Sequence, residues 1–342
     1  MKQRLTQLAL LIALGLSATA GAQTSALPAY QPHAIDPGVI RSWGHVFLKK
    51  IMAEWETAFA AQHPGVTFSD NLVSSAAATG ALFTHTADLG IVGREIRPLE
   101  IAGYTRVMKH KPFPLEVMTG SWANADKSVA LGIFVSDKNP LTKLSFAQLD
   151  AIFGAEHLAG APANIRTWGQ LGVSGPLASH SIHPYGGELD AAPAFYFSQT
   201  VMHGSQLWNE QLRHCDDIDR PDHTTYVAQQ HIVDELSKDP DGIALSGTGF
   251  KAPGIKLLAI STGPEGPYIL PTPATVEDRT YPLSRSVWIY TNQAPGQPLD
   301  PRTCEFLRFI LSREGQELVR KEGEYLPLTP ALVAAQLRKL DQ

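Results

Sequence analysis

The sequence YPLSRSVWIY at residues 281–290, continued by LSREGQELVRKEGEYLPL at 311–328, decides the fold. Val287 to Tyr290 is a short apolar run rich in β-branched and aromatic residues, which predicts a buried strand. From Cys304 to about Lys321, apolar residues recur at helical spacing, which predicts one amphipathic helix. A strand followed by a helix with one buried face is the repeating unit of an α/β protein.

The same alternation of strand and helix patterns extends toward the N-terminus. A helix is predicted from about His45 to His63, because apolar side chains recur at every fourth position. Asp88 to Val92 and Val129 to Val135 predict buried strands, and Ser145 and Pro193 are typical of the first residues of two further helices. The sequence therefore predicts an α/β fold whose sheets are mainly parallel and flanked by helices.

The first residues have the composition of a secretory signal. Lys2 and Arg4 supply positive charge, Leu8 to Leu16 is an uncharged apolar run, and Ala20-Gly21-Ala22 is a small-x-small cleavage site. The apolar run is about half as long as the ~20 residues that a membrane-spanning helix needs. Residues 1–22 are therefore predicted to be a signal peptide, and the protein is expected to be periplasmic.

The rest of the chain is long enough for two lobes. After cleavage about 320 residues would remain, more than one hydrophobic core usually supports. Residues 23–35 are predicted to form an irregular leader, and no lipid anchor is expected because the first cysteine is Cys215. Cys215 and Cys304 are the only cysteines. A disulfide between them and two separate thiols both remain open.

Charge and motifs exclude several classes of function. The net charge is -5, and no basic stripe is present, so neither nucleic acid nor an anionic membrane is an expected partner. The sequence has no nucleophile elbow, phosphate-cradling loop or His-Glu-x-x-His helix, so no enzyme is expected. His180 and His183 lie on opposite faces of an extended segment, and residues 214–223 are expected to form a solvated acidic loop rather than a metal site.

Four segments in order along the chain resemble the phosphate-type periplasmic substrate-binding proteins of ABC transporters. They are WGHVFLKKIMAEWETAFAAQHPGVTF at 43–68, ADLGIVGREI at 87–96, VSDKNPLTKLSFAQLDAIF at 135–153, and the pair quoted at the outset. The most specific part is that pair, with a Tyr-Pro-Leu-Ser-Arg strand entry and a Leu-Ser-x-Glu-Gly-Gln helix that ends in a Leu-Pro-Leu turn.

The resemblance implies a type II periplasmic-binding-protein fold. Such a fold has two α/β lobes joined by crossover strands, with the ligand cleft between them and closure by a hinge. Lobe 1 would comprise 36–125 plus 280–342, and lobe 2 would comprise 126–279. The resemblance also implies a monomer that binds a small solute without a cofactor and serves an inner-membrane ABC permease.

The family holds phosphate at two places in lobe 1. One is a Gly-Ser-rich turn that opens a helix, and Ser74 and Ser75 stand there in this sequence. Their alternative role is only to cap the helix. The other place is a serine-rich turn after a strand, where Gly93 has lost the hydroxyl and Arg94 is retained. Arg94 is expected either to face the ligand or to pair with Glu95 or another carboxylate.

The third phosphate-holding place, in lobe 2, is the one that departs most from the family. The family motif Arg-x-Asp-Gly-Ser-Gly-Thr corresponds to residues 187–193, with Gly187 at the arginine and Ala-Ala-Pro at the last three positions. Two carboxylates, Glu188 and Asp190, stand in the turn instead. They would repel an oxyanion in a desolvated cleft, so free phosphate is disfavoured. Alternatively, Asp190 caps the following helix, or the loop has moved.

Four further residues are candidate ligand contacts. Ser42 and Trp43 belong to the first loop of lobe 1, near the cleft wall of the family, and Tyr185 and Gly186 precede the divergent turn in lobe 2. For the two aromatic side chains, the alternative is core packing. The sequence therefore predicts an exported receptor for a small polar solute. Its alternative is a ligand-free envelope interaction or sensor protein on the same fold.

Overall fold

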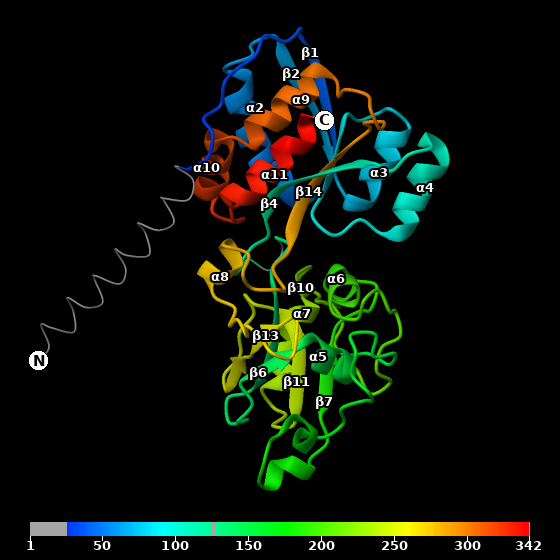
Figure 1. The fold of residues 1–342 in the computed structure, drawn as a ribbon, viewed down its shortest axis with the longest axis vertical. Coiled ribbons are helices and arrows are strands. Elements are labelled where there is room, and N and C mark those ends of the chain that lie inside the picture. Colours follow the sequence, from blue (N-terminus) through cyan, green and yellow to red (C-terminus); the bar gives the residue numbers. More distant parts are fainter. Residues whose placement is uncertain (1–25, 125–126, 342) are drawn as a thin grey trace, which may run out of the picture. The chain divides into compact units, whose positions relative to one another are not determined.

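The computed structural model describes residues 26–124 and 127–341 (Figure 1). The predicted signal peptide, 1–22, and the first residues of the leader lie outside the described residues. The described chain divides into two compact units. Unit 1 contains the residues up to Thr119 and those from Ser286 onward, and unit 2 is Gly120–Arg285. Within the described ranges, no helix is long and apolar enough to cross a membrane.

Unit 1 is a five-stranded sheet covered by helices on both faces (Figure 1). The strand order is β2-β1-β3-β14-β4. Its elements are β1 Gly38–Gly44, the 3-10 turn η1 Val46–Leu48, α2 Lys49–Ala60, β2 Val66–Leu72, α3 Ser75–Phe83, β3 Leu89–Val92, α4 Pro98–Met108, β4 Phe113–Thr119, β14 Ser286–Thr291, α9 Pro301–Ile310, α10 Arg313–Glu322 and α11 Pro330–Leu340. The predicted helix from His45 therefore begins as a 3-10 turn and becomes α-helical at Lys49.

Unit 2 contains a second five-stranded sheet, in the order β12-β5-β11-β7-β8, and two small sheets. Its elements are β5 Leu131–Ser136, β6 Lys143–Ser145, α5 Phe146–Phe153, η2 Trp168–Leu171, η3 Pro176–Ser179, β7 His183–Gly186, α6 Ala192–Thr200, β8 Arg213–His214, β9 Ile218–Asp219, β10 Thr225–Tyr226, α7 Ala228–Leu236, β11 Gly242–Gly247, β12 Ile255–Leu257, β13 Ala259–Ser261 and α8 Pro273–Glu277. As predicted, Ser145 caps α5 and Pro193 lies in the first turn of α6.

One strand in each large sheet opposes the others. β14 is antiparallel to both of its neighbours in unit 1, and β5 is antiparallel to both of its neighbours in unit 2. The remaining pairs are parallel, so four of the five strands in each sheet run in one direction. The prediction of mainly parallel sheets therefore holds for strand direction, while half of the hydrogen-bonded ladders are antiparallel.

The chain enters and leaves unit 2 at one place. Thr119 and Ser286 are paired at the ends of β4 and β14 in unit 1. In unit 2, the backbone N–H of Gly120 donates to the carbonyl of Arg285 at 2.8 Å. The two connections between the units are therefore adjacent along a continuing ladder.

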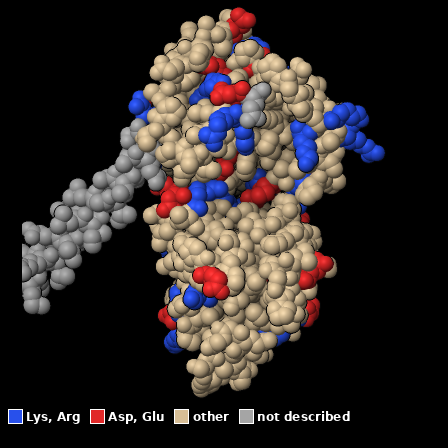
Figure 2. All heavy atoms as spheres, in the orientation of Figure 1, with Lys and Arg blue, Asp and Glu red and all other residues tan. Residues whose placement is uncertain are grey.

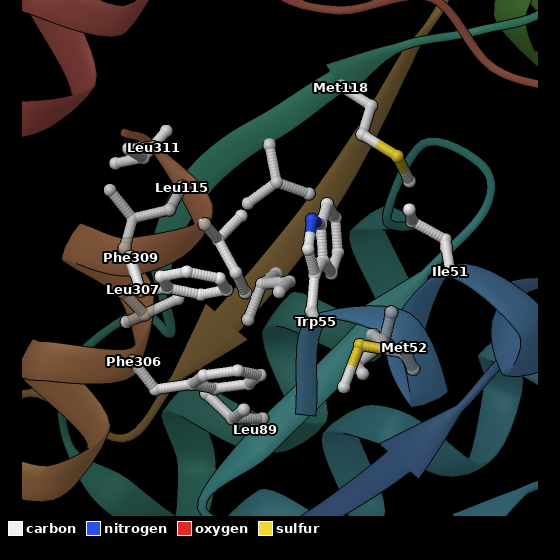
Figure 3. Packing of buried hydrophobic residues seen from close by; sticks show 14 of the residues in the cluster. Ile51, Met52, Trp55, Leu89, Leu115, Met118, Phe306, Leu307, Phe309 and Leu311 are labelled. Atoms are coloured by element: carbon white, nitrogen blue, oxygen red, sulfur yellow. The ribbon is translucent and has the colours of Figure 1, made fainter. Parts of the chain in front are cut away.

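The core of unit 1 forms where α2 and α9 pack on the sheet. Trp55, Phe306 and Phe309 are almost fully buried and converge with Leu89 and Met52 (Figure 3). The Trp55 ring donates its indole N–H to the carbonyl of Gly315 at 2.9 Å, so this large side chain is buried with its polar atom satisfied.

The prediction of one helix from Cys304 to Lys321 is wrong, because the chain forms two helices that meet at Ser312. The Ser312 hydroxyl accepts the Gly315 N–H at 3.2 Å and donates to the Phe309 carbonyl at 2.7 Å, which ends α9 and caps α10. The Gln316 amide then donates to the carbonyls of Val117 and Ile310, and its oxygen accepts the Leu328 N–H. The Leu-Ser-x-Glu-Gly-Gln sequence is therefore a buried structural joint.

The two cysteines are free thiols, Cys215 in unit 2 and Cys304 in unit 1. Burial raises the pKa of the Cys215 thiol to about 11, with a further contribution from nearby Glu235. A buried thiol with a raised pKa is a poor nucleophile, so its role is packing.

Gly315→Ala should destabilise the protein. A Cβ at Gly315 would stand 2.2 Å from the Phe309 carbonyl oxygen, so the backbone of the joint must shift. We expect a loss of about 1–3 kcal/mol in the free energy of unfolding, measured by urea denaturation. Gly103→Ala is the matched control, because a Cβ there meets nothing within 4 Å on helix α4. That change should be neutral or stabilise by up to about 1 kcal/mol, and equal effects of the two changes would contradict the packing argument.

Glu56→Gln should change how stability depends on pH. Burial and the neighbouring carboxylate of Asp70 raise the pKa of Glu56 to about 8. Because the folded pKa lies above the unfolded one, this group favours folding fully below about pH 4.5. Its contribution is lost as the pH rises toward about 8. Unfolding curves at several pH values should show a smaller decline for Glu56→Gln than for the parent or for Glu54→Gln. A decline that is identical in all three proteins would contradict the assignment.

Candidate functional site

The strand order of unit 1 creates a switch point between β1 and β3. The chain passes from β1 outward to β2 and returns to β3 on the other side of β1. In open α/β sheets, ligands bind beyond the carboxyl ends of the strands at such a point. The two ends are close here, because a Cβ on Gly44 would stand 2.0 Å from the carbonyl oxygen of Ile91.

The first turn of α3 joins this edge. The Ser74 hydroxyl caps α3 by accepting the Ala76 N–H at 3.2 Å. The Ser75 hydroxyl is buried and accepts the Gly93 N–H at 3.2 Å, which ties α3 to the residue after β3. Three of the predicted site residues are therefore brought together, and each serine oxygen already accepts a backbone N–H.

Arg94 lies within an internal ion pair. Its guanidinium donates to both carboxylate oxygens of Glu100, at 2.9 and 2.5 Å, and to the Glu95 carbonyl at 2.9 Å. The side chains of Arg94 and Glu100 are only 13% and 16% exposed. Of the two alternatives for Arg94, the structure gives the pair with a carboxylate, that of Glu100. The positive charge at this edge is therefore locally neutralised.

The prediction that Ser42 and Trp43 belong to a loop is wrong, because both lie at alternate positions on strand β1. Ser42 is fully buried, and its hydroxyl has no hydrogen-bond partner among the described residues. Trp43 is partly buried on the opposite face of the strand. Of the two, only Trp43 has a partly exposed side chain at the end of β1.

Sequence reasoning missed His45, which follows β1 directly. Its backbone N–H donates to Ile91, and its Nδ1 accepts the Phe47 N–H at 3.2 Å, so it caps the turn η1. The ring lies against Gly93. The available signal was a polar residue after a glycine at a strand end, which is the usual place of site residues in α/β proteins.

In unit 2, Tyr185 on β7 is buried rather than open to a ligand. Its hydroxyl donates to Asp239 at 2.8 Å and accepts from Arg213 at 2.6 Å. Burial and the nearby Asp239 carboxylate raise the pKa of Tyr185 to about 12. The structure therefore gives the core-packing alternative for this side chain.

The divergent turn after β7 presents its acids to solvent. Gly186 is held by the Cys215 N–H, which donates to the Gly186 carbonyl at 2.9 Å. Gly187 follows, and Glu188 and Asp190 are both exposed. The residue at the cap position of α6 is Ala191, so Asp190 stands one residue before the cap.

A second feature that sequence reasoning missed lies beside this turn. The Asp217 carboxylate accepts the Ala228 N–H at 2.6 Å, at the first residue of α7. A Cβ on Gly187 would lie 3.7 Å from the Ala228 Cβ, so the divergent turn and this helix start are neighbours. The chain's own acid thus occupies a helix terminus that would otherwise favour an anion.

The histidines expected not to bind metal have other partners. His180 pairs with Asp241 at 2.8 Å and His183 with Asp239 at 2.7 Å. Within 26–124 and 127–341, no group of three or more His, Cys, Asp or Glu side chains is arranged to hold a metal ion. Figure 2 shows both acidic and basic side chains among uncharged ones on the face drawn.

Comparison with known proteins identifies the class. The family model of the PBP superfamily domain matches residues 31–314. The phosphate-binding protein PstS of Pseudomonas aeruginosa is 30% identical over 321 residues, which cover 94% of this chain and 92% of that protein. The protein SphX of Synechococcus elongatus is 25% identical over 203 residues, covering 58% of this chain and 53% of its own length.

Solved structures agree on the fold. An ABC-type phosphate transport receptor from Vibrio cholerae has a TM-score of 0.54 at 18% identity, covering 84% of this chain and 99% of that one. PstS from Borrelia burgdorferi has a TM-score of 0.55 at 17% identity, covering 85% and 99%. The chain therefore belongs to the PBP superfamily and has the predicted periplasmic-binding-protein fold. Within that superfamily, it is a member of the phosphate-type substrate-binding proteins.

Arg94 and Glu100 should be coupled in stability. Arg94→Ala leaves the largely buried Glu100 carboxylate with the Arg97 N–H but without its cationic partner. We expect a loss of about 2 kcal/mol in the free energy of unfolding, between the values of exposed and buried ion pairs. Glu100→Gln should cost a similar amount, and the double variant should cost less than the sum of the single changes. Arg106→Ala, on the exposed side of α4, is the control and should stay within about 0.5 kcal/mol of the parent. If the losses of the two single variants in the free energy of unfolding add up to the loss of the double variant, the ion pair does not contribute to stability.

Proposed function

We propose that this protein is an exported, non-catalytic receptor that binds a small polar solute, uncharged or cationic, and delivers it to an inner-membrane ABC permease. The family membership supports receptor function, since the relatives are phosphate-binding proteins and a phosphate transport receptor. Residues 1–22 support export through a signal peptide into the periplasm without a lipid anchor. Free phosphate is a disfavoured ligand.

The main support for this proposal is the divergent turn of unit 2, residues 187–193. Between Gly187 and Pro193 there is no hydroxyl or guanidinium side chain, and Pro193 has no backbone N–H. Glu188 and Asp190 are exposed in the same turn, and Asp217 fills the neighbouring helix start. Three carboxylates and few donors make this edge unfavourable for an anion and favourable for ammonium or hydroxyl groups.

Unit 1 supports the same preference. The guanidinium of Arg94, after β3, is engaged by Glu100, so Arg94 offers little net charge to an oxyanion. The Ser74 and Ser75 hydroxyls each keep a hydrogen to donate, and the same unit has two aromatic side chains with exposed surface, Trp43 at the end of β1 and Phe47 in η1. Hydroxyl groups and aromatic rings together suit a solute with both polar and apolar surfaces.

Thermal unfolding with a defined panel tests the proposal. Phosphate, sulfate, sugars, polyols, amines and nucleotides are added singly, and a ligand that binds only the folded state raises Tm. We expect no rise with phosphate and a rise with at least one uncharged or cationic solute. At about 100 times the dissociation constant, the gain is about 2.7 kcal/mol.

The Glu188→Gln/Asp190→Asn double variant should then weaken the bound solute by about tenfold or more, the loss of one good charged contact. Glu265→Gln, at an exposed position elsewhere in unit 2, is the matched control and should bind normally. Micromolar binding of phosphate by the parent would refute the stated ligand preference. If no compound of the panel raises Tm, the result would favour the interaction or sensor alternative over transport.

A further inference from the structure

A cavity of about 320 Å³ lies in unit 1 between the leader and the turn that joins α2 to β2. Its walls are residues 32–35 and 37 of the leader and residues 62–66 of the turn. Both segments stand at the amino ends of β1 and β2, which begin at Gly38 and Val66. The candidate solute site lies at the carboxyl ends of β1 and β3, so this cavity is a separate feature.

The leader is fixed near both ends of the stretch that lines the cavity. A Cβ on Gly65 would stand 3.0 Å from the Pro37 side chain, so Pro37 packs directly on Gly65. On the other side, the buried Glu305 carboxylate on α9 accepts the Tyr30 hydroxyl at 2.7 Å and the His33 N–H at 3.0 Å. The cavity is therefore formed by packed residues in the described chain.

Among the residues that line the cavity, His63 is the polar one that is buried, with only 8% of its surface exposed. Its ring stacks on Phe59, with ring centroids 4.3 Å apart, and its Nε2 is 2.7 Å from the Tyr30 hydroxyl oxygen. The Tyr30 hydroxyl gives its single hydrogen to Glu305, so it must accept the bond from His63. His63 consequently has its N–H at Nε2.

The Nδ1 atom of His63 is left as a hydrogen-bond acceptor. A neutral imidazole with its hydrogen on Nε2 has a lone pair on Nδ1. Burial lowers the pKa of His63, which favours this neutral form. No residue in the described part of the chain bonds to Nδ1, and the ring borders the cavity. A molecule in the cavity can supply the missing donor.

The rest of the lining suits an uncharged ring. Three prolines, Ile35 and Val66 give apolar walls, and the exposed His33 is already paired with Glu305. A charged ligand would lose hydration here without gaining a partner of opposite charge. The volume is at the lower end of the range of about 300–1,000 Å³ for ligand pockets, which leaves room for a compound with one or two rings.

We propose that this cavity is a second ligand site, which takes a small uncharged aromatic compound with one O–H or N–H donor and directs that donor to Nδ1 of His63. Phenol-like and indole-like molecules have this chemistry. Tyr30 is a positioning residue, because its hydroxyl holds His63 in the form that keeps Nδ1 free of hydrogen. The proposal goes beyond the proposed function and is independent of it.

The probes are para-fluorophenol and para-fluorotoluene, which have nearly the same shape and differ in the hydrogen-bond donor. Fluorine NMR titration with the mature protein measures a dissociation constant for each. We expect para-fluorophenol to bind with a dissociation constant on the order of 1 mM. The toluene should bind about fivefold more weakly, the effect of one neutral hydrogen bond.

Two variants test the hydrogen bond itself. His63→Phe keeps a ring on Phe59 but removes the acceptor, so the two probes should bind about equally. Tyr30→Phe keeps both rings but frees the His63 N–H from its partner, so the preference for the phenol should also fall. Tyr268→Phe, which removes a hydroxyl bonded to a carbonyl in unit 2, is the matched control and should keep the full preference.

A third variant tests the location. Ala34→Trp, at an exposed position in the cavity wall, should fill the cavity and abolish binding of both probes. Circular dichroism checks the fold of each variant. The proposal is overturned if the parent binds neither probe or binds both equally, if the preference survives in His63→Phe, or if binding survives in Ala34→Trp. Each of these outcomes leaves the proposed function standing.

Discussion

The buried amide of Gln316 is the interaction on which unit 1 depends most. One side chain bonds the end of α9, the strand β4 and the turn at Leu328, while the preceding Gly315 accepts the indole N–H of Trp55. A buried amide with three satisfied bonds fixes the positions of all these segments, because leaving any one unpaired would cost about 1–3 kcal/mol. The joint also holds α2, the helix that follows β1 and η1, through the indole N–H of Trp55.

The Tyr-Pro-Leu-Ser-Arg segment has a corresponding role in unit 2. The Tyr281 hydroxyl donates to the Leu131 carbonyl, the Ser284 hydroxyl to Tyr281, and the Tyr196 hydroxyl on α6 to the Ser284 carbonyl. The Tyr-Pro-Leu-Ser-Arg and Leu-Ser-x-Glu-Gly-Gln segments, on which the family resemblance rests most, therefore stabilise the fold. Family membership and ligand can consequently diverge, since selection for the fold preserves these residues whatever the solute.

Much of the fold followed from periodicity, but the break at Ser312 did not. Apolar spacing continues through it, and only the reciprocal bonds with Phe309 and Gly315 show that the helix stops. At the candidate site, sequence could name Arg94 but not its partner, since the pairing with Glu100 depends on where α4 begins. His45 belongs to no sequence motif. Its ring contacts Gly93 only in the folded chain, so the sequence could not show this contact.

The meeting of Gly120 and Arg285 has a consequence for how this protein can change. Unit 2 is one continuous segment whose two ends are adjacent, while unit 1 is closed at the same place by the Thr119 and Ser286 pair. This is the topology of a domain insertion, in which a whole module can be lengthened, shortened or exchanged without rethreading its host. The turn after β7 belongs entirely to the inserted module, so its sequence can be changed without altering the packing of the host unit.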